Sequence, residues 1–156
     1  MRPHSMIQGL SKIWQHLPLW LQRLITWLVH PTFTVGVSAV VLNERNEILF
    51  LRHWFRESSG WQLPGGLIGR NESLEDALRR ELREETGFEV EVLSLVSAQA
   101  DNPRHVGTLY LARVLHGMLN VDRKEIAAAQ FFARDDLPSD LTEDQLRSVF
   151  LALAQE

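Results

Sequence analysis

The sequence contains no cysteine among its 156 residues. This absence excludes disulfide bridges, thiolate nucleophiles and metal sites with cysteine ligands, and it is compatible with a reducing compartment. We therefore expect a cytoplasmic protein. A hydrophobic content of 45% and a charged content of 23% are typical of a globular chain. Its length is sufficient for one domain with a real core.

Positive charge is also scarce. Lys and Arg number 16 against 20 Asp and Glu, which gives a formal net charge of −4. Because the phosphate backbone of a nucleic acid favours a basic surface, this balance argues against a nucleic-acid polymer as the partner.

The chain has no uncharged apolar run of the about 20 residues that a membrane-spanning helix needs. The most apolar segment, 13–29, is interrupted by Pro18, Gln22 and Arg23, and no small-residue cleavage site follows it. We therefore expect neither a membrane span nor a secretory signal.

The segment after Pro18 has the spacing of a short amphipathic helix. Its apolar residues recur three and four positions apart: Trp20, Leu21, Leu24, Trp27 and Leu28. Such a helix could pack on the domain, form a contact in a homodimer, or lie on a membrane surface, although the last role requires more Lys and Arg than the segment has. We divide the chain into an N-terminal helical extension, 1–31, and a domain, 32–156.

The remaining residues alternate between strand and helix patterns. β-Branched and apolar runs predict strands at 33–42, 47–52, 88–99, 105–115 and 126–132, the first two forming a hairpin. Helical patterns cover about 74–86 and 142–154, while 64–66 is predicted to be a turn. Helices among hairpin-connected strands indicate an α/β domain with a mixed sheet.

The helix predicted over 74–86 has clear ends and an unusual face. Ser73 and Asp76 match a capping box, and Gly87 supplies the C-terminal stop. On a helical projection, Glu81 and Glu85 fall inside the apolar stripe. The stripe also contains Leu74, Ala77, Leu78 and Leu82, and Glu84 falls on its edge.

Acids in an apolar stripe need an explanation. An unpaired ionised carboxylate in apolar surroundings is destabilising by several kcal/mol or becomes neutral through a shifted pKa. A bound Mg²⁺ or Mn²⁺ ion would remove this cost, because both ions favour carboxylate oxygens. The alternative is that the helix end extends beyond its packing partner and the three glutamates are simply solvated.

The residues before this helix favour the metal. Pro64, Gly65 and Gly66 can turn sharply and bring bare backbone close to a metal or a phosphate, and Glu72 adds another acid. From Gly66 the chain continues with five residues, Glu72, seven residues and then the run RELREETGF at 80–88. This pattern resembles the Nudix box at every defining position, so the chain from about residue 33 onward resembles the Nudix hydrolase family.

The resemblance implies an α/β/α sandwich around a mixed sheet, here with an extra N-terminal amphipathic helix. It also implies Mg²⁺-dependent hydrolysis of a diphosphate linkage, with Mn²⁺ as a substitute. By position Glu81, Glu84 and Glu85 would bind the metal, with a backbone carbonyl of Gly65 or Gly66 assisting. Arg80 would orient a glutamate, and Glu72 would support the loop or a further metal.

Two features of the resemblance stay open. The general base could be Glu84 or Glu85, or an acid from a later loop, for which Asp122 and Glu125 are candidates unless they are surface charges. Many relatives have an acid where this chain has Gly69 and a glycine where it has Asn71, so the loop geometry or the number of metals could differ.

The substrate is the least defined part. Arg52 could contact a phosphate and Trp54 could stack on a base, or both could be ordinary surface and packing residues. Pro103 lies 15 residues after Phe88, a spacing that resembles the ADP-ribose pyrophosphatase subgroup. We therefore expect a small nucleotide substrate such as ADP-ribose or a nucleotide sugar. The alternatives are a pyrophosphohydrolase of modified nucleoside triphosphates and a non-catalytic, nucleotide-binding regulator, which the retained glutamates argue against.

Overall fold

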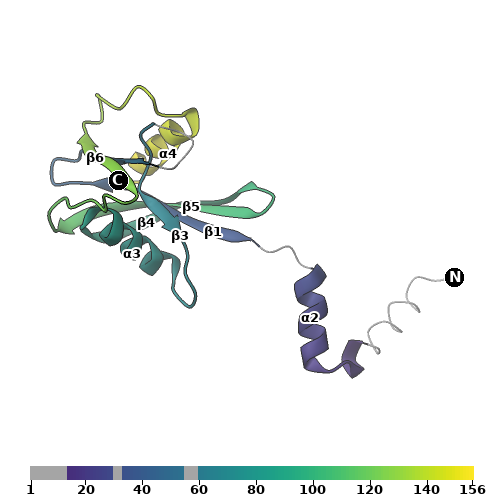
Figure 1. Ribbon diagram of the computed structural model, residues 1–156. Helices are drawn as coiled ribbons and strands as arrows, with labels where there is room; N and C mark the ends of the chain where they lie inside the picture. The colour runs from purple at the N-terminus through teal and green to yellow at the C-terminus, as the bar shows by residue number, and fades with distance from the viewer. Residues whose placement is uncertain (1–13, 30–32, 55–59) are drawn as a thin grey trace. The chain divides into compact units, whose positions relative to one another are not determined.

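The computed structural model describes residues 14–29, 33–54 and 60–156 (Figure 1). The chain divides into two compact units, Met1–Phe33 and Thr34–Glu156. The first 13 residues of the expected N-terminal extension and its boundary at 31 lie outside the described residues.

The first unit contains helix α2 (Leu19–Val29), where the amphipathic spacing predicts one. Pro18 precedes its first turn and accepts hydrogen bonds from the N–H groups of Leu21 and Gln22 at 2.9 and 3.1 Å. Trp20 and Leu28 are exposed on this helix. Within the described residues, no helix is long and apolar enough to cross a membrane.

The second unit is built on a six-stranded mixed sheet. The strands are β1 (Thr34–Leu42), β2 (Ile48–His53), β3 (Gly65–Leu67), β4 (Glu89–Asn102), β5 (His105–His116) and β6 (Ile126–Phe132). Their order is β4-β5-β1-β2-β6, and β3 pairs with β1. The β1–β5 pair is parallel and the other pairs are antiparallel. The edge strand β4 slips its register against β5 at four places.

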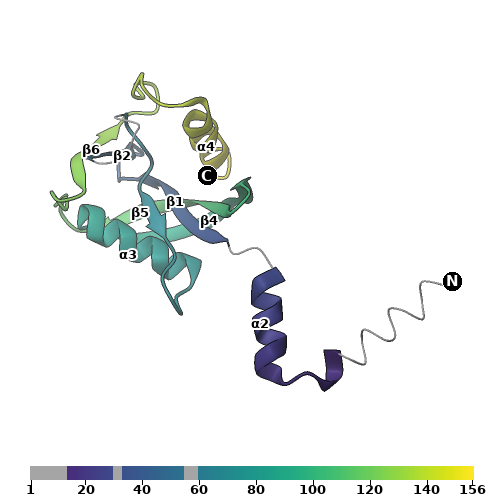
Figure 2. The same ribbon diagram turned by 45° about the vertical axis from the view of Figure 1, so that its right-hand side comes forward.

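Two helices cover opposite faces of this sheet, α3 (Leu74–Thr86) on one and α4 (Glu143–Leu153) on the other (Figures 1 and 2). The alternation of side chains along β1 divides the core accordingly: Val37, Ala39 and Val41 belong to the cluster under α3, while Val40 and Leu42 belong to the cluster under α4. The α/β/α sandwich that the Nudix resemblance implies is thereby confirmed.

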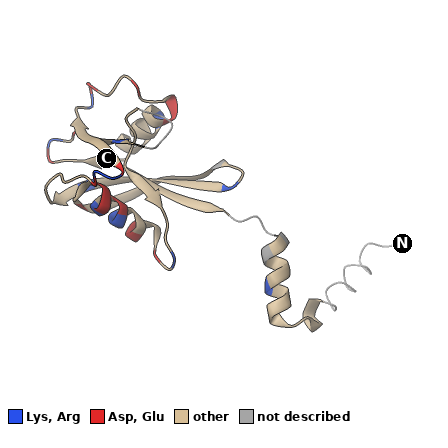
Figure 3. Ribbon diagram, in the orientation of Figure 1, with Lys and Arg blue, Asp and Glu red and all other residues tan. Residues whose placement is uncertain are grey.

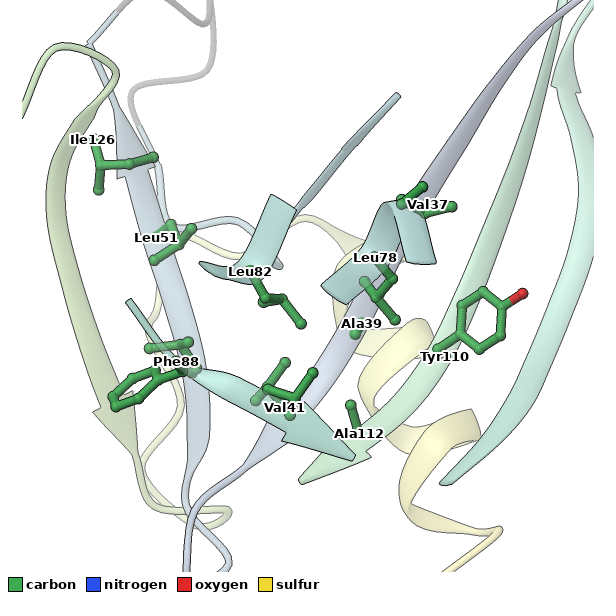
Figure 4. Packing of buried hydrophobic residues seen from close by; sticks show 13 residues of the cluster. Val37, Ala39, Val41, Leu51, Leu78, Leu82, Phe88, Tyr110, Ala112 and Ile126 are labelled. Atoms are coloured by element: carbon green, nitrogen blue, oxygen red, sulfur yellow. The ribbon is translucent and has the colours of Figure 1, made fainter. Parts of the chain in front are cut away.

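The cluster under α3 fixes the helix on the sheet. Leu78 and Leu82 are fully buried and meet Val41 from β1, Phe88 beyond the helix, and Tyr110 from β5 (Figure 4). The helix therefore presents a fixed face to the sheet, and the position of each of its glutamates follows from that packing.

We expect Leu82→Ala to lower the free energy of unfolding by about 2–5 kcal/mol, because it leaves a cavity in this cluster. Leu115→Ala removes the same atoms from an exposed position and should change stability by less than about 0.5 kcal/mol. Urea denaturation followed by circular dichroism measures both. Equal losses in the two variants would contradict the packing described for α3.

Candidate active site

The ends of α3 are defined by local sequence. Ser73 accepts a hydrogen bond from the N–H of Asp76 at 3.1 Å, and Gly87 ends the helix in the left-handed region at φ 76°. The predicted capping box is half formed, because the Asp76 carboxylate accepts the Ser73 hydroxyl at 2.7 Å. The helix begins and ends at the residues that the sequence predicts.

Glu85 is buried, with 5% of its surface exposed. Its Oε2 accepts a hydrogen bond from the N–H of Gly65 at 3.1 Å, and its Oε1 lies 3.9 Å from Nε2 of His53. The helical projection predicts that Glu85 faces the core, and the structure agrees. Through this carboxylate the last turn of α3 is joined to β2 and β3.

Glu81 lies one turn earlier and is half-buried. A Cβ atom added to Gly66 would stand 2.2 Å from the Glu81 carboxyl carbon, so a side chain at residue 66 would displace this carboxylate. A Cβ on Gly65 would stand 2.1 Å from the carbonyl oxygen of Val37, and its φ of 148° also favours glycine. The two glycines let bare backbone lie between β1 and the acids of α3.

Arg80 holds several of these acids together. Its guanidinium donates to both oxygens of Glu72, at 2.8 and 3.2 Å, to Glu81 at 2.8 Å and to Glu84 at 3.4 Å. It also donates to the carbonyl of Leu67 at 3.0 Å, so it joins α3 to the end of β3. Figure 3 shows the alternating acidic and basic residues along this helix.

The hydrogen bond from Arg80, then the N–H of Gly69, lowers the pKa of Glu72. The hydrogen bond with Glu72, followed by that with Glu81, raises the pKa of Arg80 further above its ordinary value. This guanidinium therefore keeps its charge and acts as a fixed cation among the acids.

Glu84 is exposed, with 61% of its side chain accessible. It lies on the edge of the stripe, as the projection predicts, and its side chain is more exposed than those of Glu81 and Glu85. Of the three glutamates expected to bind a metal, Glu81 and Glu85 line a common cleft, while Glu84 is absent from the described lining of that cleft.

This acidic cleft has a volume of about 470 Å³. Its lining comes from the end of β2, from β3, from α3 and from the loop before β6: His53, Gly65, Gly66, Leu67, Glu81, Glu85 and Glu125. In the described part of the chain, no group of three or more His, Asp or Glu side chains is arranged so that it could hold a metal ion. The carboxylates here are oriented by Arg80, by backbone N–H groups and by their neighbours.

Glu125 belongs to this cleft, whereas Asp122 is absent from its described lining. The Asp122 carboxylate instead accepts a hydrogen bond from the N–H of Lys124 at 2.9 Å and so shapes the loop. Of the two loop acids proposed as general base, the structure therefore brings Glu125 to the other acids.

The three residues proposed for substrate contact have separate environments, and none of them is in the described lining of the acidic cleft. Arg52 pairs with Asp140 at 2.9 Å and lies over the ring of Trp61, 4.7 Å from its centroid. The indole of Trp54 instead donates to the carbonyl of Arg123 at 3.2 Å. Pro103 is exposed in the turn between β4 and β5.

A smaller cavity of about 240 Å³ adjoins the acidic cleft. The two share residues 65–67 of β3, and the smaller one continues past Gly36 and Ser38 of β1 to His105 and Gly107 of β5. The His105 imidazole accepts or donates a hydrogen bond at Nδ1 with the Thr34 hydroxyl, 2.8 Å away. The sequence indicates that the polar loop 101–105, which includes His105, could border the pocket, but it predicts no site role for His53, whose position depends on how the strands pair.

The two departures from the Nudix pattern fit the loop before α3. Asn71 has φ 61°, a left-handed conformation that asparagine adopts more readily than most residues. Gly69 donates its N–H to Glu72, and an added Cβ there would stand 2.7 Å from the Glu72 carboxylate. The loop therefore closes around Glu72 with glycine at 69 and a left-handed asparagine at 71.

The sequence and the fold both match known proteins. The model of the NUDIX domain family matches residues 32–153. The 8-oxo-dGDP phosphatase NUDT18 of Homo sapiens is 36% identical over 121 residues, which are 74% of this chain and 38% of that protein. The chain spans between 26% and 38% of the length of the NUDT18 relatives it matches.

Two solved structures share the fold. An ADP-ribose pyrophosphatase from Streptococcus suis is 29% identical with a TM-score of 0.63, and the match covers 80% of this chain and 94% of that one. A MutT NUDIX hydrolase from Burkholderia pseudomallei is 30% identical with a TM-score of 0.65, covering 76% and 96%. The mixed sheet between two helices and the acidic cleft beside Gly65 and Gly66 agree with these matches. The chain belongs to the Nudix hydrolase family.

We expect Arg80→Gln to raise the pKa of Glu72 toward its ordinary value, because the guanidinium hydrogen bond is the main cause of its lowering. A carboxyl whose pKa is lower in the folded state stabilises that state above its unfolded pKa. The stabilisation is lost as the pH falls through the folded value, so the variant should lose less stability on acidification.

A ¹³C NMR titration of the Glu72 carboxyl carbon measures this pKa. Arg79→Gln is the matched control, because Arg79 pairs with Glu75 and Asp76 instead. An unchanged titration of Glu72 in Arg80→Gln would show that Arg80 does not hold it.

Proposed function

We propose that this protein hydrolyses a diphosphate linkage in a nucleoside diphosphate derivative with the help of Mg²⁺. The observation that carries the proposal is the acidic cleft, which Glu81, Glu85 and Glu125 line together with the bare backbone of Gly65 and Gly66. Carboxylates in the apolar stripe of a packed helix, beside bare glycine backbone, are oxygen ligands that a hard cation favours.

The donor set fits a divalent metal in its chemistry. Carboxylate oxygens from Glu81 and Glu85, with a backbone carbonyl of Gly65 or Gly66, are the oxygen ligands that Mg²⁺ and Mn²⁺ favour. The space that a side chain at Gly66 would fill lies against the Glu81 carboxylate, so the backbone reaches this group closely. Glu84, at the edge of the stripe, and Glu72, in the loop, are further candidate ligands.

When bound, the metal would neutralise the diphosphate and lower the pKa of a water molecule. The residues of the chain then supply position and proton transfer. Arg80 keeps Glu81 and Glu72 oriented through its fixed charge. Glu125 faces the same cleft and can accept the proton that water loses as its oxygen attacks phosphorus. The bond from phosphorus to the bridging oxygen breaks, and the second phosphate leaves with that oxygen.

The choice of a nucleoside diphosphate derivative rests on the smaller cavity and on two relatives. At about 240 Å³, it is below the about 300 Å³ of pockets that hold whole drug-sized ligands, so it suits one group of a larger substrate. Its shared wall, residues 65–67, would let the diphosphate reach the acids while the attached group lies beside His105. An ADP-ribose pyrophosphatase and an 8-oxo-dGDP phosphatase are both among the similar proteins, and both names denote nucleoside diphosphates.

A second candidate is the hydrolysis of modified nucleoside triphosphates, which uses the same acids. The likeness to a putative 8-oxo-dGTP diphosphatase of Bacillus subtilis, 27% identical over 118 residues, favours it. The two candidates differ in whether a nucleoside monophosphate leaves with phosphate or sugar phosphate, or with pyrophosphate.

We expect hydrolysis of ADP-ribose, a nucleotide sugar or 8-oxo-dGDP in the presence of Mg²⁺, and Glu85→Gln should lower kcat/KM by at least about 100-fold. The same assay with 8-oxo-dGTP, with the products analysed by chromatography, separates the two candidates, because only a triphosphate can release pyrophosphate. Glu75→Gln is the matched control, because Glu75 lies on the solvent face of the same helix. Full activity of both Glu84→Gln and Glu85→Gln would refute the catalytic assignment.

We expect Gly66→Ala to fold but to bind Mn²⁺ about 10- to 100-fold more weakly, because the added methyl displaces the Glu81 carboxylate from its position as a ligand. The added methyl meets the flexible end of Glu81, which can move away from the cleft. Electron paramagnetic resonance of free Mn²⁺ measures the affinity without any substrate, and circular dichroism measures folding. Wild-type affinity in the folded variant would show that Glu81 does not bind the metal.

A further inference from the structure

Trp54 is the first residue after β2, and it is bound to the loop that precedes β6 by two hydrogen bonds. Its backbone N–H donates to the carbonyl of Glu125 at 3.0 Å. Its indole N–H donates to the carbonyl of Arg123 at 3.2 Å. A single exposed tryptophan therefore holds two carbonyl groups of residues 123–125, with 62% of its own surface accessible.

The other end of the same loop is held by α3. The N–H of Asn120 donates to the carbonyl of Thr86 at 2.9 Å, and the N–H of Asp122 donates to that of Glu85 at 3.4 Å. The turn closes on itself, because Ile126 donates to the carbonyl of Asp122 at 2.8 Å. The loop of residues 120–125 is therefore hydrogen-bonded to the last turn of α3 at one end and to Trp54 at the other.

Glu125 is the residue whose position depends on this arrangement. It lines the acidic cleft with Glu81, Glu85 and His53, although it comes from a loop and they come from α3 and β2. Residues on a loop have more conformational freedom than residues on a helix, so a loop carboxylate needs a contact that fixes its backbone. The Trp54 N–H fixes the Glu125 carbonyl, and the indole bond to Arg123, two residues earlier, holds the loop at a second point.

We propose that Trp54 is a positioning residue that holds the 122–125 loop so that the Glu125 carboxylate faces the cleft. The proposal rests on the proposed function, in which Glu125 accepts the proton of the attacking water. Trp54 then acts through Glu125 and touches neither the metal nor the reacting atoms.

This role differs from the stacking on a base that the sequence suggests for Trp54. A stacking residue contributes to substrate binding and its loss raises KM, whereas a residue that positions the proton acceptor affects the chemical step and its loss lowers kcat. The two roles therefore predict changes in different constants, a raised KM for stacking and a lowered kcat for positioning.

The test is Trp54→Phe, which keeps an aromatic ring and removes the N–H donor. We expect kcat to fall about three- to ten-fold, the effect of one hydrogen bond, with KM changed by less than about two-fold. Trp20→Phe is the matched control, because it makes the same change at an exposed tryptophan of α2. Because Trp54 is exposed, the variant retains the core, which thermal unfolding verifies.

A double-mutant cycle with Glu125→Gln distinguishes positioning from a general structural role. Glu125→Gln should lower kcat by about 100-fold or more, as the loss of a general base does. In that background, Trp54→Phe should have no further effect, because the group that it positions is gone. An equal fall of kcat in both backgrounds, or a raised KM with unchanged kcat, would overturn the proposal.

The failure of this proposal is separable from a failure of the proposed function. If Glu125→Gln keeps full activity while Glu85→Gln is inactive, the positioning role is wrong and the proposed function stands. If the wild-type protein hydrolyses none of the diphosphate substrates, both are wrong, and this result comes before any variant is made.

Discussion

The close approach of bare backbone to α3 is the constraint on which the rest of the site depends. Gly65 lies against the carbonyl of Val37, where a Cβ has no room, and Gly66 lies against the Glu81 carboxylate, which a Cβ would displace. Because this backbone reaches between β1 and α3, the N–H of Gly65 can bind Glu85. The acidic cleft and the smaller cavity are both lined by this one strand, β3, which also contacts the acids of α3.

The sequence predicts α3 and the positions of its glutamates well, because the information is local. Ser73 and Gly87 define the ends through their own backbone and hydroxyl chemistry, and the period of the helix decides that Glu85 is buried and Glu84 exposed. These relations need no knowledge of distant residues. Only the depth of burial of Glu81 and Glu85 depends on the sheet that α3 covers.

Other parts of the site could not be predicted from the sequence. Strand β3 consists of Gly65, Gly66 and Leu67, which have the composition of a turn, and its strand conformation comes from pairing with β1. His53 enters the cleft at the end of β2, where the register against β6 shifts. Whether Asp122 or Glu125 lines the cleft depends on how the loop folds, and the two acids have the same chemistry, so the sequence could not distinguish them.

The irregular pairing of β4 has a consequence for the protein at high concentration. This strand is 14 residues long and forms one edge of the sheet, where unpaired N–H and C=O groups could add a strand from another molecule. Its register slips four times, for example between Val92 and Ser94 and between Leu95 and Ser97. A flat template is thereby divided into short twisted pieces, which resist edge-to-edge aggregation while exposed apolar residues such as Leu93 remain on the surface.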